Sequence, residues 1–507
     1  MKAFFLKYKN AFFKFFLFAT LVYFPIFLDL DSLPVRIWDE SRLAINAYEM
    51  NKDGDFLVTH FQGQPDMWNT KPPLMIWLQV FFSKILGIGE LSLRLPSAFA
   101  SFFVCLVIML FSIRYINYWF GLISVLILIT THGYINLHAS RTGDYDALLT
   151  FFTTASSLSF FAYCEKEKNN RKYLYFTFIF LALAVLTKSV QALFFVPGWV
   201  IYLLIRKQAG AEIKNKHFWL VFTVFIVFVS AYYFLREHFN PGYLKAVWEN
   251  ELGGRFLVVN EGHEQGFWYY YLNFISFQFT KWYFFIPCAF ILTFFLKNQL
   301  LRRFALFMWW LSAIYFIVIS SAQTKLEWYD VPLYPFLAAL CAIPLWYIFE
   351  VLKESPITGV QLKYNMLPFI FLFFVCLDPY KTIINKVYKP VEYSWDKDFY
   401  QIEYFLQDAV KGKRNLTNYF LCSDNEDIAG ENKISGGYNT GDLFYLNIIN
   451  DKGGKIDFKD WEKLELSDKV IAHQDHVKKY IESNYSFIIL ENYKNVRIYK
   501  ITGHAGI

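Results

Sequence analysis

The sequence has few charged residues for its length. Of its 507 residues, 18% are Asp, Glu, Lys or Arg, whereas 56% are hydrophobic. This composition excludes an ordinary soluble chain, and repeated apolar runs of about 17–25 residues match helices that span a bilayer. The formal charge of +6 is spread along the chain. Because no loop forms a long basic stripe, we expect no nucleic-acid partner.

The sequence also lacks the short motifs of several enzyme classes. No glycine-rich phosphate loop, nucleophile elbow or HExxH pattern is present. The six cysteines form no CxxC pair, and five lie in or beside apolar runs, which indicates buried free thiols rather than a disulfide framework. The sequence therefore offers no set of metal ligands, and we predict no metal site. Whether the protein uses a divalent metal is left open.

The apolar runs predict an α-helical polytopic membrane protein with about eleven spans. The Lys- and Arg-rich loops between them would face the cytoplasm, which places the remaining loops and the C-terminus outside. The N-terminal run follows several lysines but lacks a small-residue cleavage site, so it is predicted to be an uncleaved first span. The predicted spans are residues 12–30, 95–113, 119–137, 147–163, 173–186, 190–205, 218–235, 282–296, 304–321, 331–349 and 367–377.

Two domains are expected. The first, residues 1–380, is the membrane domain and has a long outer loop at residues 31–94, in which two helices are predicted at 40–51 and 74–86. Charged residues become more frequent after it, which predicts a small outer α/β domain over residues 381–507. Its expected helices are 399–410 and 474–483, and its expected strands are 419–422, 444–449, 487–490 and 496–501.

Carboxylates stand in two of the five short charged loops predicted on the outer face. Asp39 and Glu40 begin the first surface helix, and Asp144 lies in the second loop. Helix capping by Asp39, with a local pair to Arg42, would explain the first loop without a function. A pair between Arg141 and Asp144 would explain the second. The functional hypothesis is a general base that acts on an acceptor hydroxyl, with Glu40, Arg42 and Arg141 in support.

Cationic side chains in the outer loops predict an anion clamp. Lys and Arg stabilise phosphate oxygens through charge, and a Tyr hydroxyl can donate to them. Anchoring at the membrane edge is the alternative for each residue, and Lys188 shares this ambiguity. The candidates are Lys71, Arg255, Lys325 and Tyr329.

The order of the loop motifs is informative. Along the chain stand Trp38-Asp39-Glu40-Ser41-Arg42, Lys71-Pro72-Pro73-Leu74, Arg94-Leu95-Pro96-Ser97, Arg141-Thr142-Gly143-Asp144, Leu186-Thr187-Lys188 and Thr324-Lys325-Leu326. In this order, residues 36–340 resemble the polyprenyl-phosphate-sugar-dependent glycosyltransferases of the GT-C fold. The chain is similar to two groups of them, the aminoarabinose lipid A transferases and the protein O-mannosyltransferases.

The resemblance implies a role for several residues. Asp39 would be the catalytic carboxylate of the first outer loop, and Asp144 would be the acid of the second. Lys71, Arg255 and Tyr329 would hold the phosphate of the lipid donor. These roles follow from the matched motifs and not from spacing alone.

The chain departs from the aminoarabinose transferases at Thr70, where those enzymes have a zinc-associated acid before Lys-Pro-Pro. The resemblance therefore implies neither a zinc site nor an aminoarabinose donor. It implies an inverting transfer of a sugar from a polyprenyl-phosphate donor to a lipid A, glycan or protein acceptor, outside the inner membrane of a bacterium. A transporter or flippase for lipid-linked sugar is the alternative, but it predicts inverted repeats and broken helices, which the sequence does not show.

Overall fold

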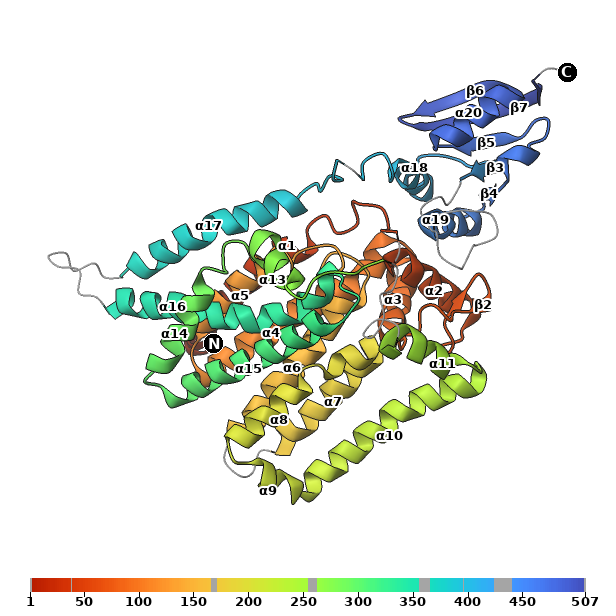
Figure 1. Ribbon diagram of the computed structural model, residues 1–507. Coiled ribbons are helices and arrows are strands. Elements are labelled where there is room, and N and C mark those ends of the chain that lie inside the picture. Colours follow the sequence, from red (N-terminus) through yellow and green to blue (C-terminus); the bar gives the residue numbers. More distant parts are fainter. Residues whose placement is uncertain are drawn as a thin grey trace.

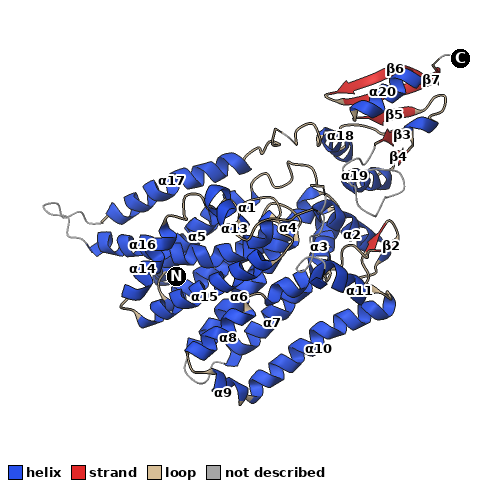
Figure 2. Cartoon of the chain, viewed as in Figure 1, coloured by secondary structure: helices blue, strands red, loops and turns tan. Residues whose placement is uncertain are grey.

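The computed structural model is mostly helical, with one larger β-sheet near the C-terminus (Figure 1, Figure 2). It describes residues 2–37, 39–165, 171–253, 262–354, 365–394, 396–423 and 440–505. The helices form a bundle. The C-terminal sheet lies beyond the end of the bundle that carries α2 (Asp39–Asp53) and α3 (Leu74–Leu86).

Seven helical segments within the described residues are long and apolar enough to cross a membrane. They are Glu90–Tyr115 (α4), Tyr145–Glu165 (α6), Arg171–Leu193 (α7, Arg171–Lys188, with η1, Ser189–Leu193), Lys216–Phe239 (α10), Gln299–Ser321 (α15), Glu327–Glu354 (η4, Glu327–Leu333, with α16, Tyr334–Glu354) and Leu367–Val387 (α17). The other predicted spans overlap α1 (Lys2–Phe27), α5 (Tyr118–Ile129), α8 (Val196–Ile205) and α14 (Phe285–Phe295). The chain is a multi-pass membrane protein, and the count of eleven spans stays a prediction.

Small and hydroxylated residues allow close packing at the centre of the bundle, where α4 and α16 each contact α5 and α6. Thr150 and Thr153 of α6 are buried, and their hydroxyls donate to carbonyls one turn earlier at 2.7 and 2.8 Å. By contrast, α10 exposes large apolar side chains along its length, including Trp219 and Phe228. A helix that is apolar on its outer face is typical of a lipid-facing span.

The first outer loop folds into both predicted helices and a short hairpin. The hairpin pairs β1 (His60–Phe61) with β2 (Gln64–Pro65) in antiparallel register. Pro73 occupies the N-cap of α3, where its missing N–H costs no helical hydrogen bond. α2 packs on both α3 and α19 (Thr440–Asp451), so a C-terminal helix contacts the loop that carries the first carboxylates.

Several short helices connect the long ones. α9 (Ala209–Ile213) precedes α10, which is followed by α11 (Tyr243–Val247) and a π-helical turn, η2 (Trp248–Gly253). α13 (Tyr269–Asn273) and η3 (Phe274–Gln278) precede α14. In Figure 1, α11 lies at the same end of the bundle as α2, α9 lies at the opposite end, and α13 lies nearer the middle.

A five-stranded mixed sheet occupies the C-terminal part of the chain, in the order β4-β3-β5-β7-β6. β3 is parallel to β4 and β5, whereas β7 is antiparallel to β5 and β6. The strands are β3 (Thr417–Cys422), β4 (Lys455–Phe458), β5 (Lys469–Ala472), β6 (Tyr485–Tyr493) and β7 (Val496–His504), with α18 (Gln401–Val410), η5 (Trp461–Lys463) and α20 (Asp475–Asn484) beside them. The domain boundary at residue 380 stays a prediction, and α17 continues across it.

One expected strand, 444–449, is wrong because this segment belongs to helix α19. Its buried side chains are Phe444, Tyr445, Leu446, Ile448 and Ile449, and two pairs of them, 444/448 and 445/449, are four residues apart, as on one face of a helix. A short run that is mostly apolar over so few positions does not distinguish a strand from a buried helix. The strands β4 and β5 were missed because each has only four residues.

Candidate functional site

The charged outer loops around residues 39–73, 140–146, 187–189 and 324–329 meet at one end of the bundle, together with Glu251, which stands just before the fourth charged loop. Each loop contacts another through a polar or aromatic pair within the described residues. In loop order the pairs are Glu40 with Gly143, Lys71 with Glu251, Asp146 with Lys188, and His138 with Trp328. Residues that are far apart in the sequence therefore form one polar region beneath the C-terminal elements.

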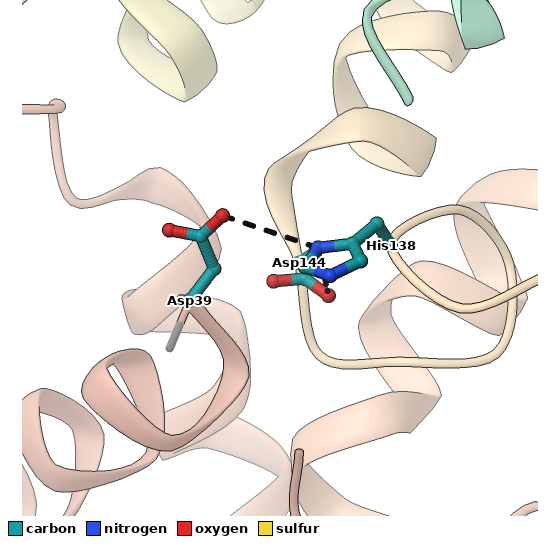
Figure 3. A group of neighbouring side chains, drawn as sticks. All are labelled: Asp39, His138 and Asp144. Atoms are coloured by element: carbon teal, nitrogen blue, oxygen red, sulfur yellow. Dashed lines mark ion pairs between the residues drawn. The ribbon is translucent and has the colours of Figure 1, made fainter. Parts of the chain in front are cut away.

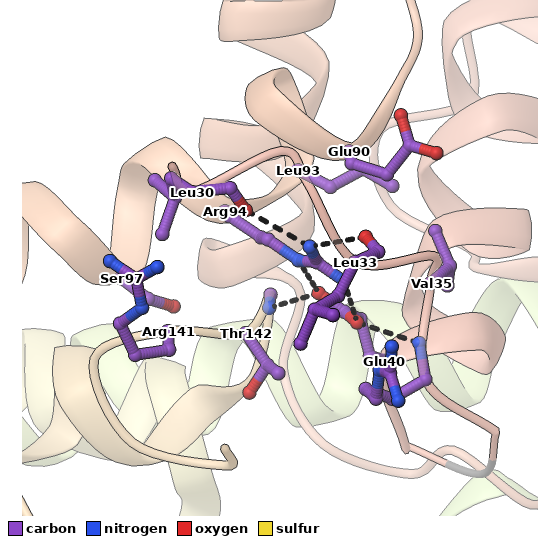
Figure 4. Close-up of polar contacts among 12 residues, drawn as sticks. Leu30, Leu33, Val35, Glu40, Glu90, Leu93, Arg94, Ser97, Arg141 and Thr142 are labelled. Atoms are coloured by element: carbon purple, nitrogen blue, oxygen red, sulfur yellow. Dashed lines mark hydrogen bonds and ion pairs between the residues drawn. The ribbon is translucent and has the colours of Figure 1, made fainter. Parts of the chain in front are cut away.

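Glu40 contacts both the second loop and α4, and with Arg94 of α4 it forms a buried ion pair (Figure 4). Arg94 donates to both carboxylate oxygens of Glu40, at 2.7 and 2.8 Å, and the N–H of Gly143 donates to one of them at 2.8 Å. Both side chains of the ion pair are almost fully buried. Burial favours the neutral acid, but Arg94 outweighs this effect and lowers the pKa of Glu40 below its usual value. Glu40 thus fixes the position of Gly143 and of the acid that follows it.

The rest of the Arg94 guanidinium binds the chain just before α2. It donates to the carbonyls of Leu30, Leu33 and Pro34 at 2.7–3.0 Å. The N–H groups of Arg94 thus bind the carboxylate of Glu40 and the backbone carbonyls that lead into the first outer loop. We call Arg94, Glu40 and Gly143 the Arg94 network.

Asp39, His138 and Asp144 form a second group, the aspartate–histidine cluster (Figure 3). His138 Nδ1 lies 3.9 Å from Asp39 Oδ2 and 3.5 Å from Asp144 Oδ2. Asp144 is 2% exposed, and burial, with further repulsion from Asp39 and Glu40, raises its pKa to about 7 despite the attraction of His138. Two carboxylates held this close together are a typical arrangement for acid–base chemistry or cation binding.

His138 itself is held in an unusual backbone conformation, with φ of 59°. Its ring stacks on Trp328 with centroids 3.6 Å apart and planes 5° apart. The backbone N–H of His138 donates to the hydroxyl of Thr142 at 2.7 Å, and that hydroxyl in turn donates to the carboxylate of Asp144. A non-glycine residue at positive φ is costly, and such strain is found at functional sites where the surroundings enforce it.

Lys71 lies beside this cluster but already has a partner. Its ammonium is 3.3 Å from Glu251 of η2 and lies over the ring of Tyr145, the residue next to Asp144. Lys71 is 7% exposed. A phosphate bound by Lys71 would therefore compete with Glu251, which sequence reasoning did not identify.

The remaining predicted site residues have other contacts. Arg42 makes a bidentate pair with Asp66 at 2.8 Å, and not the pair with Asp39 that was considered. Arg141 donates to the carbonyls of Ile26 and Asp29 at 3.1 and 3.2 Å, at the end of α1. These two cations therefore hold backbone and loop positions around the site.

The last two loops contribute less directly. The ammonium of Lys325 donates to the carbonyls of Gln265, at 2.9 Å, and Ala322, at 2.5 Å. The ring of Tyr329 lies 5.1 Å from the ammonium of Lys188, which pairs with Asp146. Arg255 lies outside the described residues. The phosphate-binding roles of Lys325, Tyr329 and Arg255 stay predictions.

A cavity of about 420 Å³ opens beside the cluster. His138 and Trp328 form part of its wall, together with the acids Glu327 and Asp330. Its other lining residues are Gly133, Asn136, Leu137, Asn273, Phe277, Gln278 and Tyr393, the last from the segment after α17. No Lys or Arg side chain lines this cavity within the described residues, so it favours a neutral or cationic ligand over an anion.

Sequence reasoning missed His138, Trp328 and Glu251. His138 stands three residues before Arg141, just ahead of the motif loop, so its position was a usable signal. Trp328 and Glu251 carried no such signal, because their partners are more than a hundred residues away and only the fold brings them together.

The chain shows similarity to known proteins in both sequence and fold. Residues 70–234 match the family model of dolichyl-phosphate-mannose-protein mannosyltransferase, which is less than half of the chain. An uncharacterized protein from Aquifex aeolicus (strain VF5) is 28% identical over 335 residues, which are 65% of this chain and 63% of that protein. The match thus spans less than two thirds of the length of this curated relative.

Two solved structures have a similar architecture. ArnT from Cupriavidus metallidurans, bound to undecaprenyl phosphate, superposes with a TM-score of 0.69 and 14% identity, covering 97% of this chain and 98% of ArnT. The oligosaccharyltransferase of Archaeoglobus fulgidus, tethered with an acceptor peptide, superposes with a TM-score of 0.50 and 10% identity, covering 99% of this chain and 75% of that structure. At such identities the likeness establishes the fold alone. This protein therefore has the GT-C fold, and its resemblance to GT-C glycosyltransferases is confirmed.

Proposed function

We propose that the protein is a membrane glycosyltransferase that moves a sugar from a polyprenyl-phosphate donor to an acceptor on the outer face of the membrane, with inversion. The observation that carries this proposal is the aspartate–histidine cluster: Lys71 lies over Tyr145, the residue next to Asp144, and His138 lines a cavity that has no Lys or Arg among its described lining residues. Such an arrangement separates a place for a departing phosphate from a place for sugar and acceptor. The GT-C fold and the mannosyltransferase family match support the same class of reaction.

Asp39 is the base in this proposal. The oxygen of an acceptor hydroxyl forms a bond to the anomeric carbon, while the bond from that carbon to the phosphate oxygen breaks. The hydroxyl proton passes to Asp39, and polyprenyl phosphate leaves with the electron pair. Asp39 is better exposed than Asp144, with side-chain exposures of 25% and 2%, so it is the acid that an acceptor can reach. A positioned base of this kind contributes about 10²–10⁴-fold to rate.

Lys71 is the counter-charge for the departing phosphate. Its ammonium can exchange Glu251 for a phosphate oxygen without leaving its place over Tyr145. A cation that meets charge as it develops on the leaving group stabilises the transition state more than the ground state. In this proposal, the donor phosphate replaces Glu251 as the partner of the Lys71 ammonium.

The cavity is the sugar and acceptor side of the site. Amides from Asn136, Asn273 and Gln278 offer both donors and acceptors to hydroxyl groups, and Trp328 and Tyr393 offer aromatic surface. The acceptor class, whether lipid A, another surface glycan or a protein, is left open by this chemistry. The location is proposed to be the outer side of a bacterial inner membrane. A transporter or flippase gains no support, since none of the matches reported above is to such a protein.

The proposal is tested with purified protein in liposomes. A donor carrying a labelled sugar on polyprenyl phosphate is mixed with membranes from cells that lack the gene, and the label is followed into lipid, glycan and protein fractions. We expect label transfer with release of polyprenyl phosphate, and a loss of about 10²–10⁴-fold in Asp39→Asn. Asp31→Asn, an exposed acid of the same loop, is the matched control and should transfer normally. Near-normal transfer by Asp39→Asn would refute the assigned role.

A further inference from the structure

The charge around the aspartate–histidine cluster is not balanced by the neighbouring cations. Arg94 is directed at Glu40 and at backbone carbonyls, Arg42 at Asp66, and Lys188 at Asp146. Within the described residues, Asp144 has no Lys or Arg ion-pair partner, and its ion-pair contact is with His138. A buried carboxylate in this situation needs a proton or a bound cation.

Two atoms of the cluster are buried without a hydrogen-bond partner within the described residues. They are Nδ1 of His138 and Oδ1 of Asp144. Asp144 is 98% buried, and its side chain points toward His138 and Asp39 (Figure 3). Buried polar atoms in native proteins are nearly always satisfied, so an unsatisfied pair at one point indicates a missing ligand.

The spacing of the three side chains fits a single ion. One ligand atom from each residue lies within 4.8 Å of the other two. Oxygen and nitrogen ligands bind a transition ion at about 2.0–2.2 Å, so two of them on opposite sides of it are about 4.2 Å apart. Small side-chain adjustments are enough to close the cluster around an ion.

We propose that Asp39, His138 and Asp144 bind a divalent metal ion. Two carboxylates and one imidazole are a donor set suited to Mn²⁺ or Zn²⁺ and, less well, to Mg²⁺. Three protein ligands leave open positions for water or substrate, as in catalytic rather than structural sites. Only one oxygen of Asp39 is needed for the ion, so the other stays available to the acceptor hydroxyl.

The surrounding contacts orient the ligands in advance. Stacking on Trp328 fixes the plane of the His138 ring, and the Thr142 hydroxyl links the backbone of His138 to Asp144. Glu40 holds Gly143, and the hydroxyl of Ser97 donates to the carbonyl of Asp144 at 3.1 Å. Partners of this kind are what fix ligand geometry and tune affinity at metal sites.

The test measures binding directly and needs no transfer activity. The full-length protein in detergent is stripped with EDTA and titrated with Mn²⁺, with free Mn²⁺ measured by electron paramagnetic resonance and tryptophan emission recorded in parallel. We expect one site per chain, with quenching that is largely lost in Trp328→Phe although the ion still binds. His138→Ala and Asp144→Asn should each weaken binding at least tenfold.

Matched controls separate this site from general metal binding. His217→Ala on α10, whose ring contacts Tyr175, and Asp31→Asn should bind Mn²⁺ like the unsubstituted chain. The melting temperature of each variant verifies that it is folded. Failure of the folded unsubstituted chain to bind Mn²⁺, or binding that is unchanged in both ligand variants, would overturn the proposal. Because this experiment does not measure sugar transfer, a failure to bind Mn²⁺ would not contradict the proposed glycosyltransferase reaction, which has a separate test.

Discussion

Asp39 and Glu40 are neighbours in the sequence but belong to two different kinds of polar region. In the Arg94 network, Glu40 has a cation on both oxygens and a backbone donor, so its charge is satisfied within the protein. In the aspartate–histidine cluster, both carboxylates pair with His138, and one oxygen of Asp144 has no hydrogen bond from any described residue. The Arg94 network holds two loops together, whereas the aspartate–histidine cluster is the region where we propose that a ligand binds.

This difference indicates how the site is built. A fully satisfied buried network is rigid, and an under-satisfied one is stable only if its surroundings enforce it. The Arg94 network supplies that enforcement, because Gly143 is held by Glu40 and is followed directly by Asp144. Substitutions in the two regions should therefore have opposite effects on stability and on activity.

The largest effect on stability is expected from Arg94→Met. Removing the cation leaves Glu40 charged and buried, which costs about 3–5 kcal/mol. Thermal unfolding in detergent measures the loss. The control is Lys413→Met, which breaks an ion pair with Asp408 in which the Lys413 side chain is 66% exposed, and it should leave the melting temperature almost unchanged. Equal losses in the two variants would contradict the structural role of the Arg94 network.

A smaller effect, on activity, is expected from Lys71→Met. Loss of a charge-assisted contact of about 1.5–3 kcal/mol predicts a fall in kcat/KM for the lipid donor of about 10–100-fold. The variant also leaves Glu251 unpaired, which lowers stability. The double variant Lys71→Met/Glu251→Gln should recover the stability but not the donor use. Recovery of both would show that Lys71 serves only to neutralise Glu251.

The smallest effect is expected from Asp442→Asn in α19. Burial raises the pKa of Asp442 to about 7, and it also raises the pKa of Glu403 in α18, which Asp442 raises further. Because the folded pKa of Asp442 is above its ordinary value near 3.8, the stability it contributes is complete below about pH 4 and is lost as pH rises through about 7. The melting temperature should therefore fall from about pH 5 to about pH 8, and fall less in Asp442→Asn. An identical pH dependence in the variant would show that another group is responsible.

The C-terminal segment belongs to this comparison because it contacts the Arg94 region. Arg36 makes a bidentate pair with Glu392 at 2.7 Å, and the hydroxyl of Tyr445 donates to Glu90 at 2.7 Å. The residue after Glu392, Tyr393, lines the cavity beside the cluster. The segment for which the sequence offered no function thus contributes a side chain to the wall of this cavity.

The sequence predicted most of the helices and both carboxylates of the cluster, because apolar runs and ordered motifs are local signals. It did not predict the pairing of Glu40 with Arg94, which are 54 residues apart, or that of His138 with Trp328. For Lys325, the sequence predicted a phosphate-binding role, but the structure shows contacts to the backbone. It was selected for its charge in a motif, but its ammonium is directed at two backbone carbonyls. Charge and spacing identify candidates, and only the fold shows which charges already have partners.

The most direct measurement is sugar transfer by folded Asp39→Asn protein, with its melting temperature determined beside that of Glu40→Gln. We predict that Asp39→Asn melts close to the unsubstituted chain and loses about 10²–10⁴-fold of its transfer rate, whereas Glu40→Gln melts well below it. Transfer at a near-normal rate by Asp39→Asn, or a loss of stability equal to that of Glu40→Gln, would contradict the separation of the two regions.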